Sequence, residues 1–230
     1  MTESMFPPPD QTDEEGILGY TFDLNTEMLA DAYSHGIFPW PYEEKTVLWF
    51  SPPKRSVLFF DHLHVPSRLK RFFRNHPFTL KISERFDEVI EHCANVPRKG
   101  QDGTWITEKI KTAYREFHRL GFAHSFEAYG ENGELAGGMY GISLGGIFCG
   151  ESMFHLQTGA SKFALLSAVA TLKNCGLDML DTQVLTPLLA RFGAQEIDRS
   201  DFQTELKQRI GKPLTAEFLR SRAKTPESLI

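Results

Sequence analysis

The order of apolar and polar segments between residues 121 and 194 constrains the fold of this chain more than any other feature. The predicted elements are, in order, strands over 124–129, 135–142 and 147–149, a helix over 160–174 and a strand over 177–180. Asn132-Gly133, a strong hairpin signal, stands between the first two strands. This order predicts an α+β fold in which helices back a sheet.

Two polar groups interrupt the hydrophobic sequence of this stretch, Gly150-Glu151-Ser152 and Asp181-Thr182-Gln183. Asp181 directly follows a predicted buried strand, where a carboxylate is usually either a helix cap or part of a site. Thr186 suits the cap of the next helix better, because Pro187 follows it at the position proline favours. Since side chains two residues apart on a strand share a face, Gln183 should point the same way as Asp181. We therefore predict a functional site at these strand ends.

The rest of the chain divides into an arm and a second group of elements. Residues 1–16 are proline-rich and acidic, which predicts a flexible N-terminal arm. Further predicted elements are helices over 23–35, 66–74, 86–93 and 108–120, strands over 46–50, 56–60 and 78–82, and a loop over 98–103. We expect a small N-terminal α/β domain over residues 17–65 and a C-terminal domain over 66–230, with the boundary anywhere from 60 to 80.

A basic segment stands out in a chain whose net charge is −5. The predicted helix over 66–74 carries Arg68, Lys70, Arg71 and Arg74, and Asp61 is the acidic residue that offsets them nearby. One interpretation is a solvated helix face, which charge runs usually form. The other is a set of phosphate contacts, because a nucleic acid would have to meet a local basic patch on an acidic protein.

Several classes of protein are disfavoured by what the sequence lacks. It contains no G-x-x-x-x-G-K-[ST] loop, no G-x-S-x-G elbow and no H-E-x-x-H. Cys93, Cys149 and Cys175 are odd in number, lie far apart and form no C-x-x-C pair, which argues against a disulfide framework or a zinc site and favours a reducing cytoplasm. No apolar run reaches the roughly 18 residues that a membrane span needs.

A series of short motifs, in order along the chain, resembles the leucyl/phenylalanyl-tRNA–protein transferase family. The motifs are Gly36-Ile-Phe-Pro-Trp40, Trp49-Phe-Ser-Pro52, Gly103-Thr-Trp-Ile106, Gly137-Gly-Met-Tyr-Gly141, Phe148-Cys-Gly-Glu-Ser-Met-Phe154, Ala160-Ser-Lys162, Asp181-Thr-Gln183 and Phe192-Gly-Ala194. No single motif is specific for the family. The occurrence of all of them in the family's order, from about residue 16 to past 194, is specific. The chain departs from the family's pattern at Thr21-Phe22 and at Leu188.

The resemblance implies transfer of leucine or phenylalanine, with methionine as a further candidate, from aminoacyl-tRNA to proteins that begin with Arg or Lys. This transfer marks the acceptor for degradation by the Clp system. The implied fold has a small N-terminal domain and a C-terminal domain similar to acyl-CoA N-acyltransferases (GNAT-like). The resemblance also implies a cytoplasmic monomer that uses no coenzyme A, metal or other cofactor.

The resemblance further implies roles for particular residues. Asp181, Gln183 and Glu151 would form the catalytic group, in which Asp181 orients and polarises Gln183. The pocket for the transferred side chain would consist of Met139, Phe148, Gly150 and Leu180. Trp49 and Trp105 would lie against the terminal adenosine, where stacking contributes ~1–3 kcal/mol. Arg68, Lys70, Arg71 and Arg74 would contact phosphates of the tRNA acceptor stem.

Three alternatives stay open at this stage. A coenzyme A-dependent N-acetyltransferase would share the C-terminal layout, but Gln157-Thr-Gly-Ala160 does not supply its usual Q/R-x-x-G-x-G/A pyrophosphate loop. A non-catalytic RNA-binding protein would use the basic helix and leave Glu151, Asp181 and Gln183 unexplained. A leucyltransferase that acts on acidic N-termini is disfavoured by the motifs alone.

Overall fold

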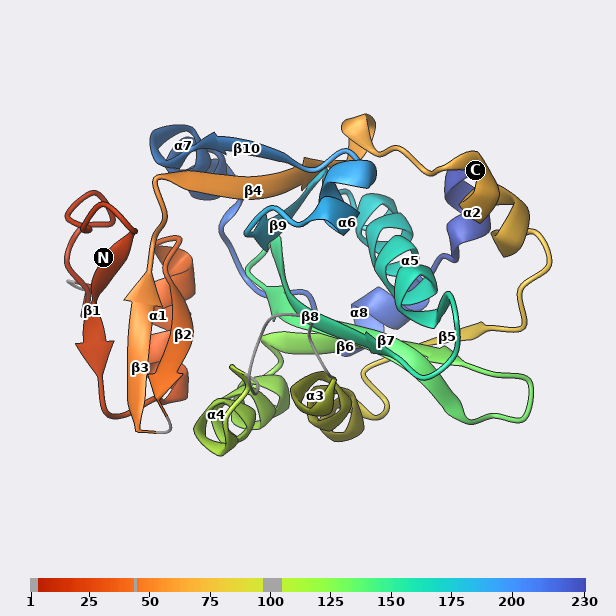
Figure 1. The fold of residues 1–230 in the computed structure, drawn as a ribbon, viewed down its shortest axis with the longest axis horizontal. Helices are drawn as coiled ribbons and strands as arrows, with labels where there is room; N and C mark the ends of the chain where they lie inside the picture. Colours follow the sequence, from red (N-terminus) through yellow and green to blue (C-terminus); the bar gives the residue numbers. More distant parts are fainter. Residues whose placement is uncertain (1–3, 44, 97–104) are drawn as a thin grey trace.

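The computed structural model describes residues 4–43, 45–96 and 105–230, and within them the chain forms two sheets (Figure 1). The smaller sheet has the order β1-β3-β2, and all its pairs are antiparallel. Its elements are β1 (Ile17–Thr21), α1 (Thr26–Ser34), β2 (Phe38–Glu43) and β3 (Thr46–Phe50). Two prolines stand within β2, which is an edge strand, where proline's missing N–H is tolerated.

The larger sheet has seven strands in the order β10-β4-β9-β8-β7-β6-β5. They are β4 (Lys54–Phe59), β5 (Thr79–Ile82), β6 (Ala123–Tyr129), β7 (Leu135–Ser143), β8 (Phe148–His155), β9 (Met179–Gln183) and β10 (Gln195–Asp198). Its neighbouring strands run antiparallel except β8 and β9, which run parallel. A parallel pair needs a crossover connection, and here the connection contains helix α5.

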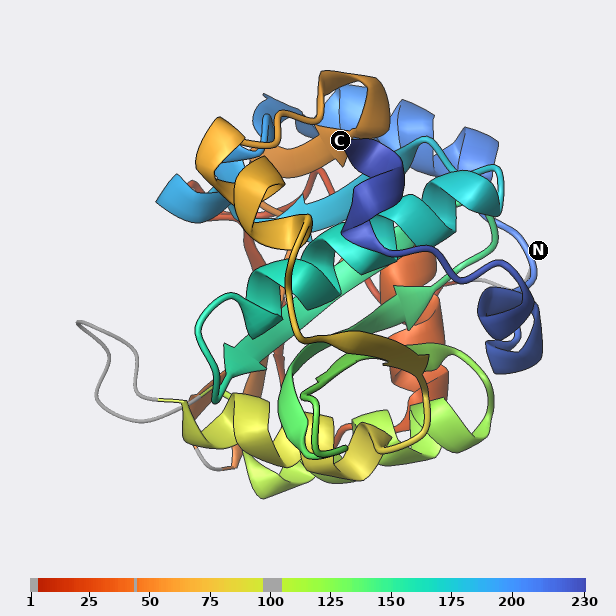
Figure 2. The same ribbon diagram turned by 90° about the vertical axis from the view of Figure 1, so that its right-hand side faces the viewer.

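Helices cover both faces of this sheet. The apolar helix α5 crosses one face, whereas α3 and α4 pack on the opposite face, shown in yellow-green in Figure 2. The helices are α2 (Ser67–Phe73), α3 (Phe86–Asn95), α4 (Glu108–Arg119), α5 (Ala160–Asn174), α6 (Pro187–Arg191), α7 (Arg199–Arg209) and α8 (Ala216–Ser221), and short 3-10 turns span Phe60–His62 and Pro226–Leu229. The predicted α+β class, a small N-terminal part and a sheet backed by helices, is confirmed. No described helix is long and apolar enough to cross a membrane.

Local signals predicted the helix ends well. The prediction for α5 is confirmed over its whole length, and α1 begins after Asn25, whose side chain accepts a hydrogen bond from the backbone N–H of Met28. Thr186 caps α6 as expected. The strand predictions were too short: β8 continues to His155, and β9 continues through Gln183, so Asp181 lies within a strand and not after its end. The predicted loop over 98–103 lies outside the described residues.

The two sheets meet earlier in the chain than the predicted domain boundary. Strand β4 pairs with β9 and β10 of the larger sheet, although residues 17–65 were assigned to the N-terminal domain. The sheets therefore change over at Ser51-Pro52-Pro53, while the domain division itself stays a prediction. The described part of the N-terminal arm contacts the small sheet, since the Phe6 ring lies 4.6 Å from that of Trp49.

Gly141 on β7 is expected to tolerate no larger residue. A Cβ there would lie 2.3 Å from the backbone oxygen of Cys149 and 2.3 Å from the Phe148 ring. We expect Gly141→Ala to lower the free energy of unfolding by about 3 kcal/mol, because the clash involves backbone and a buried ring. Gly211→Ala is the matched control, with 3.8 Å to its nearest neighbour. Urea denaturation of both variants measures the difference, and equal midpoints would contradict the prediction.

Candidate active site

The candidate site lies where the two parallel strands separate. Strands β8 and β9 are paired only at Phe148 with Leu180 and at Cys149 with Asp181 in the described structure. Beyond these pairs the strands diverge, and the residues that follow on each strand, Glu151 and Gln183, border a cavity. The sheet thus presents polar side chains from two neighbouring strands into one opening.

A bulge on β8 directs Glu151. Tyr140 pairs with Ser152 and Gly141 pairs with Gly150, so Glu151 is an extra residue without a cross-strand partner on β7. Bulges of this kind re-aim a side chain and often stand beside active sites. The half-buried Glu151 carboxylate is therefore presented from the middle of a strand and not from its end.

Two buried tyrosines hold the Glu151 carboxylate. The hydroxyl of Tyr33 on α1 donates to Oε1 at 2.8 Å, and that of Tyr114 on α4 lies 3.3 Å from Oε2. The two hydroxyls are 2.6 Å apart. Burial raises the pKa of Glu151 to about 7, with a smaller contribution from Asp181, against the opposing hydrogen bond from Tyr33. A carboxyl with this pKa exchanges protons near neutral pH.

Gln183 completes the pair at the mouth of the cavity. Its amide Nε2 donates to Oε1 of Glu151 at 2.7 Å, which leaves the amide oxygen as the atom that can accept from a substrate N–H. The backbone of Gln183 has a φ of 60°, in the left-handed region that few residues other than glycine adopt. Its backbone N–H donates to Oδ1 of Asp181 at 2.9 Å, which stabilises this conformation. Asp181 thus holds Gln183 through the backbone and not through the side-chain amide.

Asp181 is neutralised by an arginine that sequence reasoning missed. Arg55 on β4 donates to both carboxylate oxygens, at 2.9 and 2.7 Å, and both side chains are buried. The guanidinium lies between the rings of Phe38 and Phe202, 4.6 Å from each centroid. Burial alone would lower the pKa of Arg55, but the ion pair with Asp181 outweighs it and raises that pKa. Asp181 therefore acts as a buried structural anion.

The cavity has an apolar body and a polar edge. Its volume is about 420 Å³, and its lining is Trp40, Trp105, Met139, Gly150, Glu151, Ser152, Met153, Leu165, Leu180, Thr182, Gln183, Val184, Thr186 and Leu189. The rings of Trp40 and Trp105 stack at 5.5 Å with 13° between their planes. Such a site binds an apolar group beside a polar reacting centre.

Comparison with known proteins decides the family. The family model "Leucyl/phenylalanyl-tRNA protein transferase" matches residues 57–207, and the model of that family's N-terminal domain matches residues 22–53. The chain belongs to this family. A transferase so named from Anaeromyxobacter sp. (strain Fw109-5) is 46% identical over 211 residues, which cover 92% of this chain and 89% of the relative. Another from Teredinibacter turnerae is 44% identical over 207 residues, covering 89% and 80%.

Among solved structures, L-PGS from Bacillus licheniformis matches with a TM-score of 0.40 and 12% identity, over 85% of this chain and 65% of that one. A tandem GNAT protein of the clavulanic acid pathway matches with a TM-score of 0.38 and 14% identity, over 76% and 57%. Likenesses this distant carry no further argument, and the family assignment rests on sequence.

The residues expected from the family resemblance divide into three groups in the structure. Met139, Gly150, Leu180, Trp105, Glu151 and Gln183 line the cavity. Phe148, Asp181 and Trp49 are buried and are not part of its lining. The Trp49 ring N–H donates to Thr21 at 3.0 Å, and Trp40 stands beside Trp105 where Trp49 was expected. Arg68, Lys70, Arg71 and Arg74 lie on or at the end of α2, away from this cavity.

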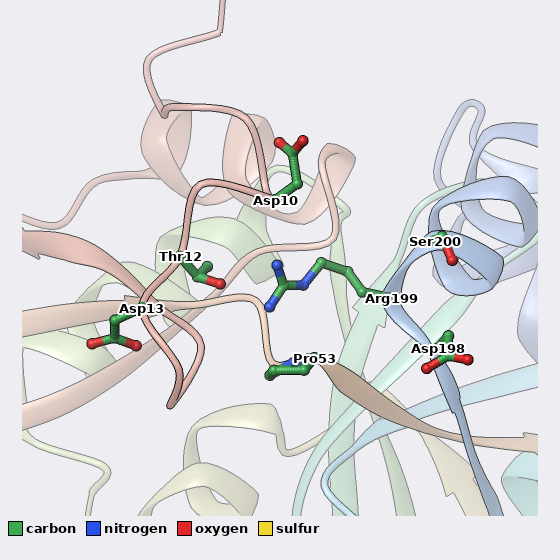
Figure 3. A pocket seen from close by; sticks show the side chains of 7 residues that line it. All are labelled: Asp10, Thr12, Asp13, Pro53, Asp198, Arg199 and Ser200. Atoms are coloured by element: carbon green, nitrogen blue, oxygen red, sulfur yellow. The ribbon is translucent and has the colours of Figure 1, made fainter.

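Another cavity, of about 360 Å³, lies between the N-terminal arm and the start of α7 (Figure 3). Figure 3 shows the guanidinium of Arg199 directed toward Thr12 and Pro53, with Asp10 and Asp13 on the arm around it. Arg199 also donates to the backbone oxygen of Pro52 at 3.2 Å. The arm thus contributes Asp10, Thr12 and Asp13 to the lining of this cavity.

The elevated pKa of Glu151 predicts a pH-dependent cost to stability. The ordinary value is 4.5 and the folded value about 7, so the protonated form is favoured by folding. Its stabilising effect is therefore complete below pH 4.5 and is lost as the pH rises through 7. Glu151→Gln has no carboxyl to titrate. We therefore expect the free energy of unfolding of the variant minus that of the wild type to rise by about 2 kcal/mol from pH 4.5 to pH 8. Urea denaturation at both pH values measures this, and a pH-independent difference would contradict it.

Proposed function

We propose that this protein transfers leucine or phenylalanine from aminoacyl-tRNA to the N-terminal amine of proteins that begin with Arg or Lys. The observation that carries the proposal is the Glu151–Gln183 pair, which stands at the polar edge of an apolar cavity. In this reading the cavity holds the transferred side chain against Met139 and Leu180. The stacked Trp40–Trp105 pair offers a surface for the terminal adenosine.

The reaction needs placement more than activation. The aminoacyl ester is already activated, and holding an amine against it is worth several kcal/mol, on the order of 7–11 for ideal alignment. No cofactor or metal is required by this chemistry. The Gln183 amide oxygen accepts a hydrogen bond from the attacking amine and fixes its direction.

Glu151 is suited to take the proton from that amine. An N-terminal ammonium group has a pKa of about 8 and first loses one proton to solvent, whereas the pKa of Glu151 is about 7. The nitrogen of the resulting neutral amine bonds to the ester carbonyl carbon while a second proton passes from it to the Glu151 carboxylate. The carbon–oxygen bond to the ribose then breaks, and the ribose oxygen receives that proton from Glu151. Atoms and charges balance without another reactant.

A panel of donors and acceptors tests the proposal. The purified protein is incubated with labelled Leu-, Phe- and Met-tRNA or acetyl-coenzyme A, and with peptides that begin with Arg, Lys, Asp or Glu. We expect leucine and phenylalanine on the Arg and Lys peptides. Label only on the Asp and Glu peptides would favour a leucyltransferase for acidic N-termini. Acetylation without aminoacyl transfer would favour an N-acetyltransferase, and would overturn the proposal.

A further inference from the structure

A third cavity, of about 420 Å³, lies between α2, α5 and α6. Its lining includes one cation from each of these three helices, Arg68, Lys162 and Arg191. Apolar side chains, among them Phe72 and Leu188, form the rest of its wall. We call this hollow the basic cavity.

The charge of the basic cavity is uncompensated. No Asp or Glu belongs to its lining, and within residues 4–43, 45–96 and 105–230 none of its three cations forms an ion pair. Two other cations are paired by contrast: Lys173, also on α5, contacts Asp61 at 3.2 Å, and Arg209 contacts Asp178 at 2.8 Å. In a chain with a net charge of −5, three unpaired cations around one hollow favour an anionic ligand.

The basic cavity adjoins the cavity beside Glu151 and Gln183, here called the aminoacyl cavity, across two helices. On α5, Leu165 lines the aminoacyl cavity and Lys162, one turn earlier, lines the basic cavity. On α6, the neighbouring residues Leu189 and Leu188 line the aminoacyl and the basic cavity respectively. A nucleotide chain that passes out of the aminoacyl cavity over α6 therefore reaches the basic cavity.

We propose that the basic cavity binds backbone phosphates of the single-stranded 3′ end of the tRNA donor, on the 5′ side of the nucleotide that carries the amino acid. The inference rests on the proposed function. Arginine and lysine bind phosphate oxygens through charge-assisted hydrogen bonds. The half-buried Phe72 ring gives a sugar or base an apolar surface, and it packs where a Cβ on Gly159 would come within 2.6 Å. Lys162 and Arg191 are thereby added to the tRNA-binding residues. The sequence alone had indicated only Arg68 and its neighbours on the basic helix.

The test compares two donors in Lys162→Gln, Arg191→Gln and the double variant. One donor is leucyl-tRNA, and the other is the 3′-leucyl ester of adenosine, which has no phosphate. Lys207→Gln is the matched control, since Lys207 is an exposed cation on α7 that lines neither cavity. Equilibrium binding of uncharged tRNA, measured at several salt concentrations, gives a readout independent of transfer.

We expect the double variant to lose on the order of tenfold in tRNA affinity and in kcat/KM with leucyl-tRNA, and to show a salt slope smaller by roughly 0.7 for each cation removed. The rate with leucyl-adenosine should stay unchanged. An equal loss with both donors, or an unchanged tRNA affinity and salt slope, would overturn the inference. If the wild type binds tRNA through these residues but transfers no leucine, the proposed function fails while the phosphate site stands.

Discussion

Arg55→Met is expected to lower the free energy of unfolding by about 3–5 kcal/mol, because it leaves the Asp181 carboxylate buried without a cation. Both side chains are at most 2% exposed, so water cannot replace the lost partner. Methionine keeps most of the apolar volume between the rings of Phe38 and Phe202, which limits the effect to the lost charge. Urea denaturation at pH 7 measures the loss.

Two further variants separate charge from packing. Arg119→Met removes an exposed cation that pairs with Glu116, and should change stability by less than about 1 kcal/mol. Arg55→Met combined with Asp181→Leu removes both buried charges, and should recover most of the stability. Because Asp181 also accepts the backbone N–H of Gln183, this double variant should still transfer leucine poorly. Arg55→Met with wild-type stability would show that the pair is not needed for folding.

Gln183→Ala is expected to lower kcat/KM for leucyl transfer about 100-fold, because the attacking amine loses the group that fixes its direction. The truncation also removes the hydrogen bond to Glu151, which is 2.7 Å long. Gln183 is only 6% exposed, but it borders an existing cavity, so its truncation should lower the free energy of unfolding by only about 1 kcal/mol for the lost hydrogen bond. Initial rates with leucyl-tRNA and a peptide that begins with Arg measure the effect.

Gln183→Glu is the informative companion variant. It keeps an acceptor oxygen but places a second carboxylate beside Glu151, so partial activity would support positioning by the oxygen. Val184→Ala is a matched control on the same cavity edge, because Val184 is exposed and offers no polar side chain. A Gln183→Ala rate equal to that of the control would contradict the role given to Gln183.

The local elements of this structure could be predicted from the sequence, but few of its long-range contacts could. A helix beginning close to Asp23, the hairpin at Asn132-Gly133 and the whole of α5 follow from short-range signals; the structure has all three, with α1 starting at Thr26. Glu151 and Gln183 could be found because polar residues within apolar strands stand out. Arg55 could not, since its partner is 126 residues away and the sequence around it predicts only a strand.

The tyrosine and tryptophan contacts illustrate the same limit. Tyr33 and Tyr114 follow ordinary amphipathic patterns on their helices, and only the packing of α1 against α4 brings both to Glu151. Trp49 is buried while Trp40, on the paired strand β2, lines the cavity beside Trp105. The register of strand pairing decides which tryptophan reaches the site, and this register could not be predicted from the sequence.

A double-mutant cycle on leucyl transfer tests the central claim that Glu151 and Gln183 act together on the acceptor amine. The rates of the wild type, Glu151→Gln, Gln183→Ala and the double variant are measured with labelled leucyl-tRNA and an Arg-initiated peptide. We predict transfer by the wild type, a loss of about 100-fold in each single variant, and little further loss in the double variant, since residues that act as a unit are not additive. A double-variant loss equal to the product of the two single losses, about 10,000-fold, would contradict the account.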